Sequence, residues 1–343
     1  MPRYNLINME KKAINLDLDQ QYIEKLENII FQPVFIMGVQ RSGTSILYKL
    51  LTATQLFNPV TAYHMIRYPE LIHNHINNQE RNAKNILAEF LKDHSQSDRG
   101  IDGLKITPDF PEEYGFLLGQ KTEQAKLTPK NLPVFIELCK KIQFISDPKK
   151  PILLKNPWDF SNFIYIKQVF PTAKFIFIHR NPIKTLTSQI KAMRLLLQNK
   201  STYMAMLSPW YNQLFDCKVR LYCYQLLYSS YIPIRSIQVV RRMAKNTNYF
   251  LENINKLDKT DYINITYENL CQQPETVITN ILKFLAMPPP HQINYHDYIK
   301  PRKTNELNEL KMIKKTILKK LHAYMSYCGY TNEEMTSSQN ESI

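Results

Sequence analysis

A short segment near the start of the chain combines two glycines, several hydroxyl side chains and one arginine. Gly38 and Gly43 are separated by four residues, and Arg41 lies between them. The apolar run that precedes the glycines, residues 33–37, is typical of a buried strand. Leucines at helical spacing follow, so we expect a strand, a tight turn and a helix that begins near Thr44. The N–H groups of such a turn and the dipole of the helix favour binding of an anion.

The spacing of the two glycines is that of a Walker A loop, which binds nucleoside triphosphates. Where such a loop has a lysine, this sequence has Thr44, and Ser45 follows it. A loop without that lysine, and with Arg41 inside it, suits a phosphate-like group that is bound without a metal ion. An ordinary strand-to-helix turn without a ligand and the loop of a P-loop kinase are the alternatives at this point.

Two further apolar runs end in a cation. One covers residues 151–155 and ends in Lys155, and the other leads to Arg180. Functional groups of an open parallel sheet gather where its strands end. We therefore expect these two cations and Arg41 to lie in one crevice. Ser188 follows Arg180 by eight residues, about two turns into the next expected helix.

Strands and helices alternate along the sequence. We expect strands at 33–37, 151–155, 174–180 and 262–267, with helices between them. This alternation predicts an α/β fold of three layers, in which a central parallel sheet has helices on both faces.

The composition limits the classes of partner. The 343 residues include 44 Lys and Arg against 30 Asp and Glu, a net charge of +14, which favours an anionic partner. A basic protein that binds nucleic acid or a membrane surface is therefore the non-enzyme alternative. No nucleic-acid motif is recognised, so we expect no nucleic-acid partner. The five cysteines form no C-x-x-C pair, which argues against a zinc site and for reduced thiols. Without a signal pattern or a run long enough for a membrane span, we expect a cytoplasmic protein.

Four segments, in the order in which they occur, carry a resemblance to a known family. The run Gln-Arg-Ser-Gly-Thr-Ser at 40–45 looks like a loop for a 5′-phosphosulfate, and 153–157 resembles a lysine-bearing strand end. Residues 175–188 look like a motif that binds a 3′-phosphate, and 266–270 are similar to a late strand and helix. The family is that of the sulfotransferases that use 3′-phosphoadenosine 5′-phosphosulfate (PAPS). The loop has the form seen in tyrosylprotein sulfotransferases and many bacterial members.

The resemblance implies a P-loop-like fold. It also implies metal-independent, in-line transfer of a sulfuryl group from PAPS to a hydroxyl or amine of an unidentified acceptor (a sugar, lipid, peptide or small molecule). An inactive relative that only binds the nucleotide is a further alternative. The implied residues are Arg41 and Lys155 at the leaving phosphate, Ser42, Gly43, Thr44 and Ser45 with Arg41 at the phosphosulfate, Arg180 and Ser188 at the 3′-phosphate, and Tyr267 in the nucleotide pocket.

The acceptor also needs a general base, which in this family is a His or a Glu. His64 is our first choice, because it falls where the family often has its acidic residue or histidine. Glu70 is the second choice. Glu112 and Glu113, in a Pro-Glu-Glu-Tyr segment seen in related bacterial members, are the remaining candidates.

We expect three regions: a helical extension at 1–30, a sulfotransferase domain at 31–330 and a disordered tail at 331–343. The aromatic stretch 203–231 either walls an apolar acceptor pocket, packs in the core or forms the face of a homodimer. The basic residues of the loop after Pro290 either close over the nucleotide phosphates or are simply solvated; these are Lys300, Arg302 and Lys303.

Overall fold

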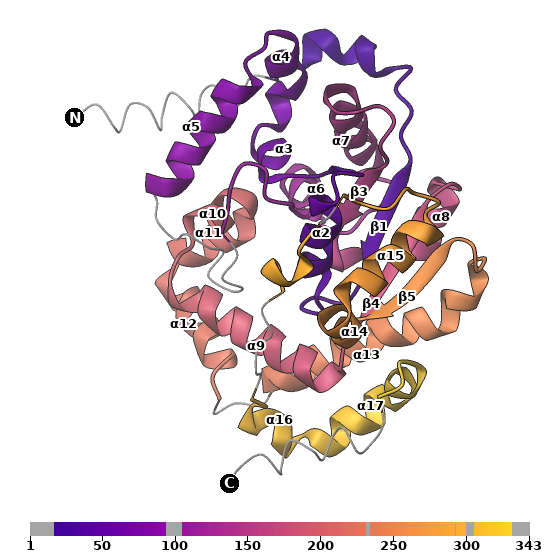
Figure 1. Cartoon of the computed structure of the whole chain (residues 1–343). Coiled ribbons are helices and arrows are strands. Elements are labelled where there is room, and N and C mark those ends of the chain that lie inside the picture. Colours follow the sequence, from indigo (N-terminus) through magenta and orange to yellow (C-terminus); the bar gives the residue numbers. More distant parts are fainter. Residues whose placement is uncertain (1–16, 94–104, 231–233, 292, 300–304, 331–343) are drawn as a thin grey trace.

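The computed structural model describes residues 17–93, 105–230, 234–291, 293–299 and 305–330 (Figure 1). The expected tail at 331–343, the basic cluster Lys300, Arg302 and Lys303, and the first half of the expected N-terminal extension lie outside these residues.

A parallel sheet forms the centre of the structure, with the strand order β2-β3-β1-β4-β5. The four expected strands are confirmed. The fifth, β2, was not expected from the sequence, because it has only two residues and one of them is a proline. It pairs with β3 at the edge of the sheet, where a strand tolerates proline. The bounds are β1 Pro33–Met37, β2 Asn58–Pro59, β3 Ile152–Lys155, β4 Lys174–His179 and β5 Tyr262–Thr266.

The two faces of the sheet bury different kinds of side chain. In β1, Val34 and Ile36 belong to an aliphatic cluster, whereas Phe35 and Met37 belong to an aromatic-rich one. Successive side chains of a strand point to opposite faces, so the division continues along β4. On the aromatic-rich face Phe35 stacks on Phe175, with ring centroids 5.7 Å apart. Both faces are therefore covered, which confirms the three-layer arrangement.

Helices cover the two faces (Figure 1). Leucines of α2 and apolar residues of α14 and α15 join the aliphatic cluster, whereas α7, α8, α9 and α13 contribute to the aromatic-rich one. The α-helices are α2 Thr44–Ala53, α3 Ala62–Ile66, α4 Leu71–Ile76, α5 Glu80–Asp93, α6 Gly115–Thr122, α7 Leu132–Ile145, α8 Phe163–Val169, α9 Pro182–Gln198, α10 Thr202–Leu207, α11 Pro209–Asp216, α12 Lys218–Leu227, α13 Ile234–Asn253, α14 Tyr267–Gln272, α15 Pro274–Phe284, α16 Asn308–Met312 and α17 Lys314–Tyr327.

The described part of the N-terminal extension is tied to the domain by a buried ion pair. It holds a short 3₁₀ helix, η1 Gln20–Leu26. Asp19, which precedes this helix, lies 3.0 Å from the ammonium group of Lys141 in α7, and both side chains are buried. No helix in the described part of the chain is both apolar enough and long enough to cross a membrane.

Candidate active site

The loop between β1 and α2 has the backbone shape of an anion cradle. Arg41 and Gly43 have left-handed conformations, with φ of 71° and 104°. No side chain caps the start of α2. Among the described residues, the N–H groups of Gly43, Thr44 and Ser45 have no acceptor. These donors at a helix N-terminus are suited to a negatively charged ligand.

Tyr267, the first residue of α14 directly after β5, closes one side of this loop. A Cβ atom at Gly43 would lie 2.3 Å from Cδ2 of the Tyr267 ring, so the contact requires glycine. The guanidinium of Arg180 lies over the same ring, 4.2 Å from its centroid. The ring is therefore packed between the loop and the cation that follows β4.

Arg180 is held against the loop but keeps part of its hydrogen-bonding capacity. Its Nη1 donates to the carbonyl oxygen of Arg41 at 3.1 Å. Its Nε is buried and has no partner among the described residues. A buried guanidinium nitrogen without an acceptor is rare in a folded protein and fits a ligand that supplies one.

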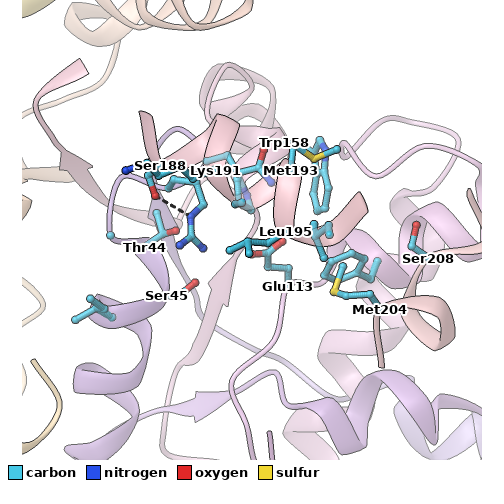
Figure 2. A pocket seen from close by; sticks show the side chains of 18 of the residues that line it. Thr44, Ser45, Glu113, Trp158, Ser188, Lys191, Met193, Leu195, Met204 and Ser208 are labelled. Carbon is cyan, nitrogen blue, oxygen red and sulfur yellow. Dashed lines mark hydrogen bonds between the residues drawn. The ribbon is translucent and has the colours of Figure 1, made fainter. Parts of the chain in front are cut away.

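Ser188 meets the loop from the second turn of α9. This helix starts as expected, with Pro182 in its first turn and the Asn181 side chain accepting from the N–H groups of residues 183 and 184. Nε of Arg41 donates to Oγ of Ser188 at 3.2 Å, shown as a dashed line in Figure 2. Arg180 and Ser188, eight residues apart in the sequence, therefore both contact Arg41.

Lys155, the last residue of β3, contacts the loop through its side chain. Its side chain is buried, and its Nζ donates to Ser45 Oγ at 3.0 Å and to Glu113 Oε1 at 2.8 Å. The neighbouring Glu112 has a different environment: it accepts a hydrogen bond from the Tyr203 hydroxyl and another from the Glu113 N–H. The two adjacent carboxylates therefore have different partners among the described residues: Tyr203 for Glu112 and Lys155 for Glu113.

A cavity of about 590 Å³ joins these residues. Arg41, Gly43, Thr44, Ser45, Glu113, Arg180, Ser188 and Tyr267 are among the residues that line it. In the view of Figure 2, Thr44, Ser45 and Ser188 lie on one side, Trp158, Met204 and Ser208 lie on the other, and Glu113 lies between them. Lys155 and Ser42 are not part of the lining. Lys155 instead contacts two of the lining residues, Ser45 and Glu113. Ser42 is buried, and its N–H donates to the carbonyl oxygen of Val39.

His64 and Glu70 lie outside the cavity lining. The N–H of His64 donates to Thr61 Oγ1 and its Nδ1 accepts from the Thr61 N–H, a reciprocal cap at the start of α3. Burial lowers the pKa of His64 to about 3, with further lowering by the nearby Lys84 charge. Glu70 forms an ion pair with Arg67, at 3.2 Å. The structure thus brings neither residue together with Arg41 and Arg180.

Some residues at the cavity were missed by sequence reasoning. Nε2 of Gln189 donates to the carbonyl oxygen of Gln40 and so attaches α9 to the loop. Lys49 lines the cavity one turn after Ser45, and that spacing on one helix face could have revealed it. Trp158 also lines it, and its place three residues after Lys155 was an available signal. In the described residues, no group of three or more His, Cys, Asp or Glu side chains is arranged to hold a metal ion.

Comparisons with known proteins identify the family. The profile of the Sulfotransferase family matches residues 33–291. Sulfotransferase STF9 from Mycobacterium avium has a similar structure, with a TM-score of 0.63 and 13% identity over 90% of this chain and 80% of its own. Sulfotransferase STF1 from Mycobacterium tuberculosis has a TM-score of 0.55 and 14% identity, over 88% of this chain and 79% of its own. No curated protein matches the sequence.

The donor of this family, PAPS, carries anionic groups at two places, a 5′-phosphosulfate and a 3′-phosphate. The cavity likewise has two sets of donors without an acceptor in the described part of the chain, the N–H groups that begin α2 and the Arg180 Nε. The residues present therefore fit such a molecule. The family profile covers most of the chain, and the sheet and helices have the family's fold. This chain belongs to the sulfotransferase family and is an enzyme that transfers a sulfuryl group from PAPS to an acceptor.

Proposed function

We propose that the cavity catalyses in-line sulfuryl transfer to a hydroxyl or amine and needs no metal ion. One observation supports this proposal: three cations, Arg41, Lys155 and Arg180, gather around one glycine loop. Each of them ends or follows one of three neighbouring strands of the sheet. Arg41 and Lys155 can supply the positive charge opposite the leaving group in place of a metal ion, and Arg180 supplies the charge opposite the 3′-phosphate.

The loop and Lys155 act at the 5′ end of the donor. PAPS supplies the sulfuryl group and a phosphate that leaves. The N–H groups of Gly43, Thr44 and Ser45 and the side chain of Arg41 bind the phosphosulfate, whereas Ser42, which is buried, supports the loop from within. Lys155, 3.0 Å from Ser45 Oγ, stabilises the negative charge that grows on the leaving oxygen. This stabilisation is greater in the transition state than in the ground state, so it raises the rate.

Arg180 and Ser188 bind the 3′-phosphate, and Tyr267 lines the nucleotide pocket. Arginine has a planar fork of donors that suits a phosphate. The Nε of Arg180 has no partner within the described residues, so it can bind a phosphate without losing a contact. The ring of Tyr267 fixes the guanidinium from one face. This set would distinguish the donor from nucleotides that lack a 3′-phosphate.

Glu113 is the general base of this proposal. Its carboxylate lines the cavity, and Figure 2 shows it between the loop and the opposite wall. A carboxylate there can take the proton from the acceptor as the acceptor oxygen or nitrogen forms its bond to sulfur. The 2.8 Å contact with Lys155 holds the carboxylate in its orientation. The sequence-based choice of His64 as base stays a prediction, and substitution of His64 tests it.

The sequence-based expectations about partners and location also stay predictions. We expect that the protein has no nucleic-acid partner and that it is cytoplasmic. Formation of a homodimer is an open alternative.

A calorimetric titration tests the donor site. The purified protein is titrated with 3′-phosphoadenosine 5′-phosphate (PAP), AMP and ATP, each with magnesium and with EDTA. We expect PAP to bind at least about tenfold more tightly than AMP, since the 3′-phosphate adds charge-assisted hydrogen bonds. We expect EDTA to change neither value. Preference for ATP with magnesium, or absence of PAP binding, would contradict the proposal.

A further inference from the structure

Helix α9 runs along the cavity from its polar part to an apolar part. Seven of its residues line the cavity, and five of them have the spacing of one helix face: Ser188, Lys191, Ala192, Leu195 and Leu196. Ser188 contacts Arg41, whereas Leu195 lies two turns further on, about 10 Å along the axis. The same helix face therefore changes from phosphate-binding chemistry to apolar chemistry.

The wall around Leu195 is made of large apolar side chains. In Figure 2, Trp158, Met193 and Met204 lie on the side of the view away from Thr44 and Ser45. The rings of Trp158 and Phe116 meet edge to face, with centroids 5.4 Å apart. Several of these side chains are unusually exposed for their type: Leu195 is 47% exposed, Trp158 40% and Trp210 48%. A ligand that covered them would gain about 25 cal/mol for each Å² of apolar surface removed from water.

Two hydroxyl groups of this wall have hydrogen-bond partners within the protein. Ser208 Oγ accepts from the N–H of Tyr211, and the Tyr211 hydroxyl donates to the carbonyl oxygens of residues 196 and 199. The lysines of the lining, which include Lys105 and Lys191, supply positive charge. They do not supply the paired donors and acceptors that the several hydroxyls of a sugar require.

We propose that the acceptor carries its reactive hydroxyl on an apolar body, an alkyl or aryl alcohol rather than a sugar. This proposal rests on the proposed function, because it needs the donor at the glycine loop and Glu113 as base. The apolar body packs against Leu195, Trp158 and Trp210, and the hydroxyl faces Glu113. The oxygen bonds to sulfur, the bond from sulfur to the 5′-phosphate breaks, and the proton passes to Glu113. The products are a sulfate monoester of the alcohol and PAP.

The two tryptophans of the chain provide a direct measurement. Both line the cavity, so their fluorescence reports on a ligand at its apolar wall. The protein, saturated with PAP, is titrated with 1-octanol and, separately, with glucose. We expect a saturable change of emission with 1-octanol and none with glucose at equal concentration. With PAPS in place of PAP, we expect octyl sulfate to form at least about tenfold faster than glucose sulfate, given the difference in apolar burial.

Two leucine variants make the test specific. Leu195→Asp places a charge on the apolar wall and should weaken 1-octanol binding at least about tenfold, because a carboxylate is costly beside an apolar ligand. Leu226→Asp is the matched control: Leu226 is 45% exposed, lies on α12 and is not part of the lining. It should leave 1-octanol binding unchanged, and both variants should bind PAP as the unmodified chain does.

The possible outcomes separate the two proposals. If PAP binds but 1-octanol neither changes the emission nor is sulfated, the acceptor assignment is wrong and the donor site stands. Faster sulfation of glucose, or equal loss of 1-octanol binding in both leucine variants, would also overturn the assignment. If PAP does not bind at all, the proposed function fails and the acceptor assignment fails with it.

Discussion

The ammonium group of Lys155 lies 2.8 Å from the carboxylate of Glu113, and both side chains are buried. A buried charge is costly unless it is paired, so the loss of either side chain would leave the other as a buried charge without this partner. Lys155 ends β3, next to the strand that leads into the glycine loop. The ion pair therefore places the base and the leaving-group cation at a fixed position relative to the loop.

Glu113→Gln removes the proton acceptor but keeps the size and shape of the side chain. We expect turnover of PAPS with an acceptor to fall by about 10² to 10⁴, the usual contribution of a general base. PAP affinity, measured by calorimetry, should change little. Glu89→Gln, at an exposed position of α5, is the control and should leave both quantities as they are. Unchanged turnover in Glu113→Gln would remove Glu113 from the mechanism.

Arg180→Ala removes the forked donor from the proposed 3′-phosphate site. Hydrogen bonds to charged groups contribute about 1.5–3 kcal/mol, so PAP affinity should fall by about 10- to 150-fold. AMP lacks the 3′-phosphate, and its affinity should therefore change much less. Arg241→Ala, on the exposed surface of α13, makes the same change of charge away from the cavity. Equal losses for PAP and AMP would mean that Arg180 does not bind the 3′-phosphate.

Gly43→Ala tests the contact between the loop and Tyr267. The new Cβ would lie 2.3 Å from the ring, so either the ring or the loop must move, and PAP binding should be lost. Gly329→Ala is a matched control, since Gly329 also has a positive φ, of 77°, but has no atom within 4 Å of the added Cβ. Its cost should be that of the left-handed conformation alone, about 1–2 kcal/mol of unfolding free energy. Similar PAP affinities in the two variants would contradict the proposed packing.

His64→Gln separates a capping role from a role as base. Threonine with glutamine three residues later is a standard capping box, so the start of α3 should stay intact. If His64 only caps, turnover should persist. A loss of turnover of about a hundredfold with unchanged PAP affinity would instead support His64 as the base.

The same variant makes a prediction about pH. Burial lowers the pKa of His64 to about 3, so between about pH 6.5 and 3 the unfolded chain binds a proton that the folded chain does not. The unfolding free energy should therefore fall as the pH is lowered through this range, by at most about 1.4 kcal/mol per pH unit from this residue. The slope should be smaller in His64→Gln. The pKa of His179 is also lowered by burial, to about 4, and its contribution is common to both proteins.

The sequence was sufficient for the features that are local. β1, β3, β4 and β5 are continuous apolar runs, and the helix start after Arg180 follows from Asn-Pro chemistry. Glu112 and Glu113 could not be ranked, because neighbours in sequence acquired different partners, Tyr203 and Lys155, from distant segments. The cap that His64 forms with Thr61 could not be predicted either, because the usual capping box has Glu or Gln three residues after the threonine rather than histidine. The break at Ile313 between α16 and α17 has no marker in the sequence, because residues 305–328 include neither proline nor glycine.

The contact of Tyr267 with Gly43 determines when the donor site becomes complete during synthesis of the chain. The glycine loop is synthesised early, but Ser188 lies 147 positions after Arg41, and Tyr267 comes later still. A nascent chain on the ribosome therefore lacks a complete donor site until β5 and the start of α14 have emerged. Fragments that end before residue 262 should be unable to retain PAP, even though they contain the whole glycine loop.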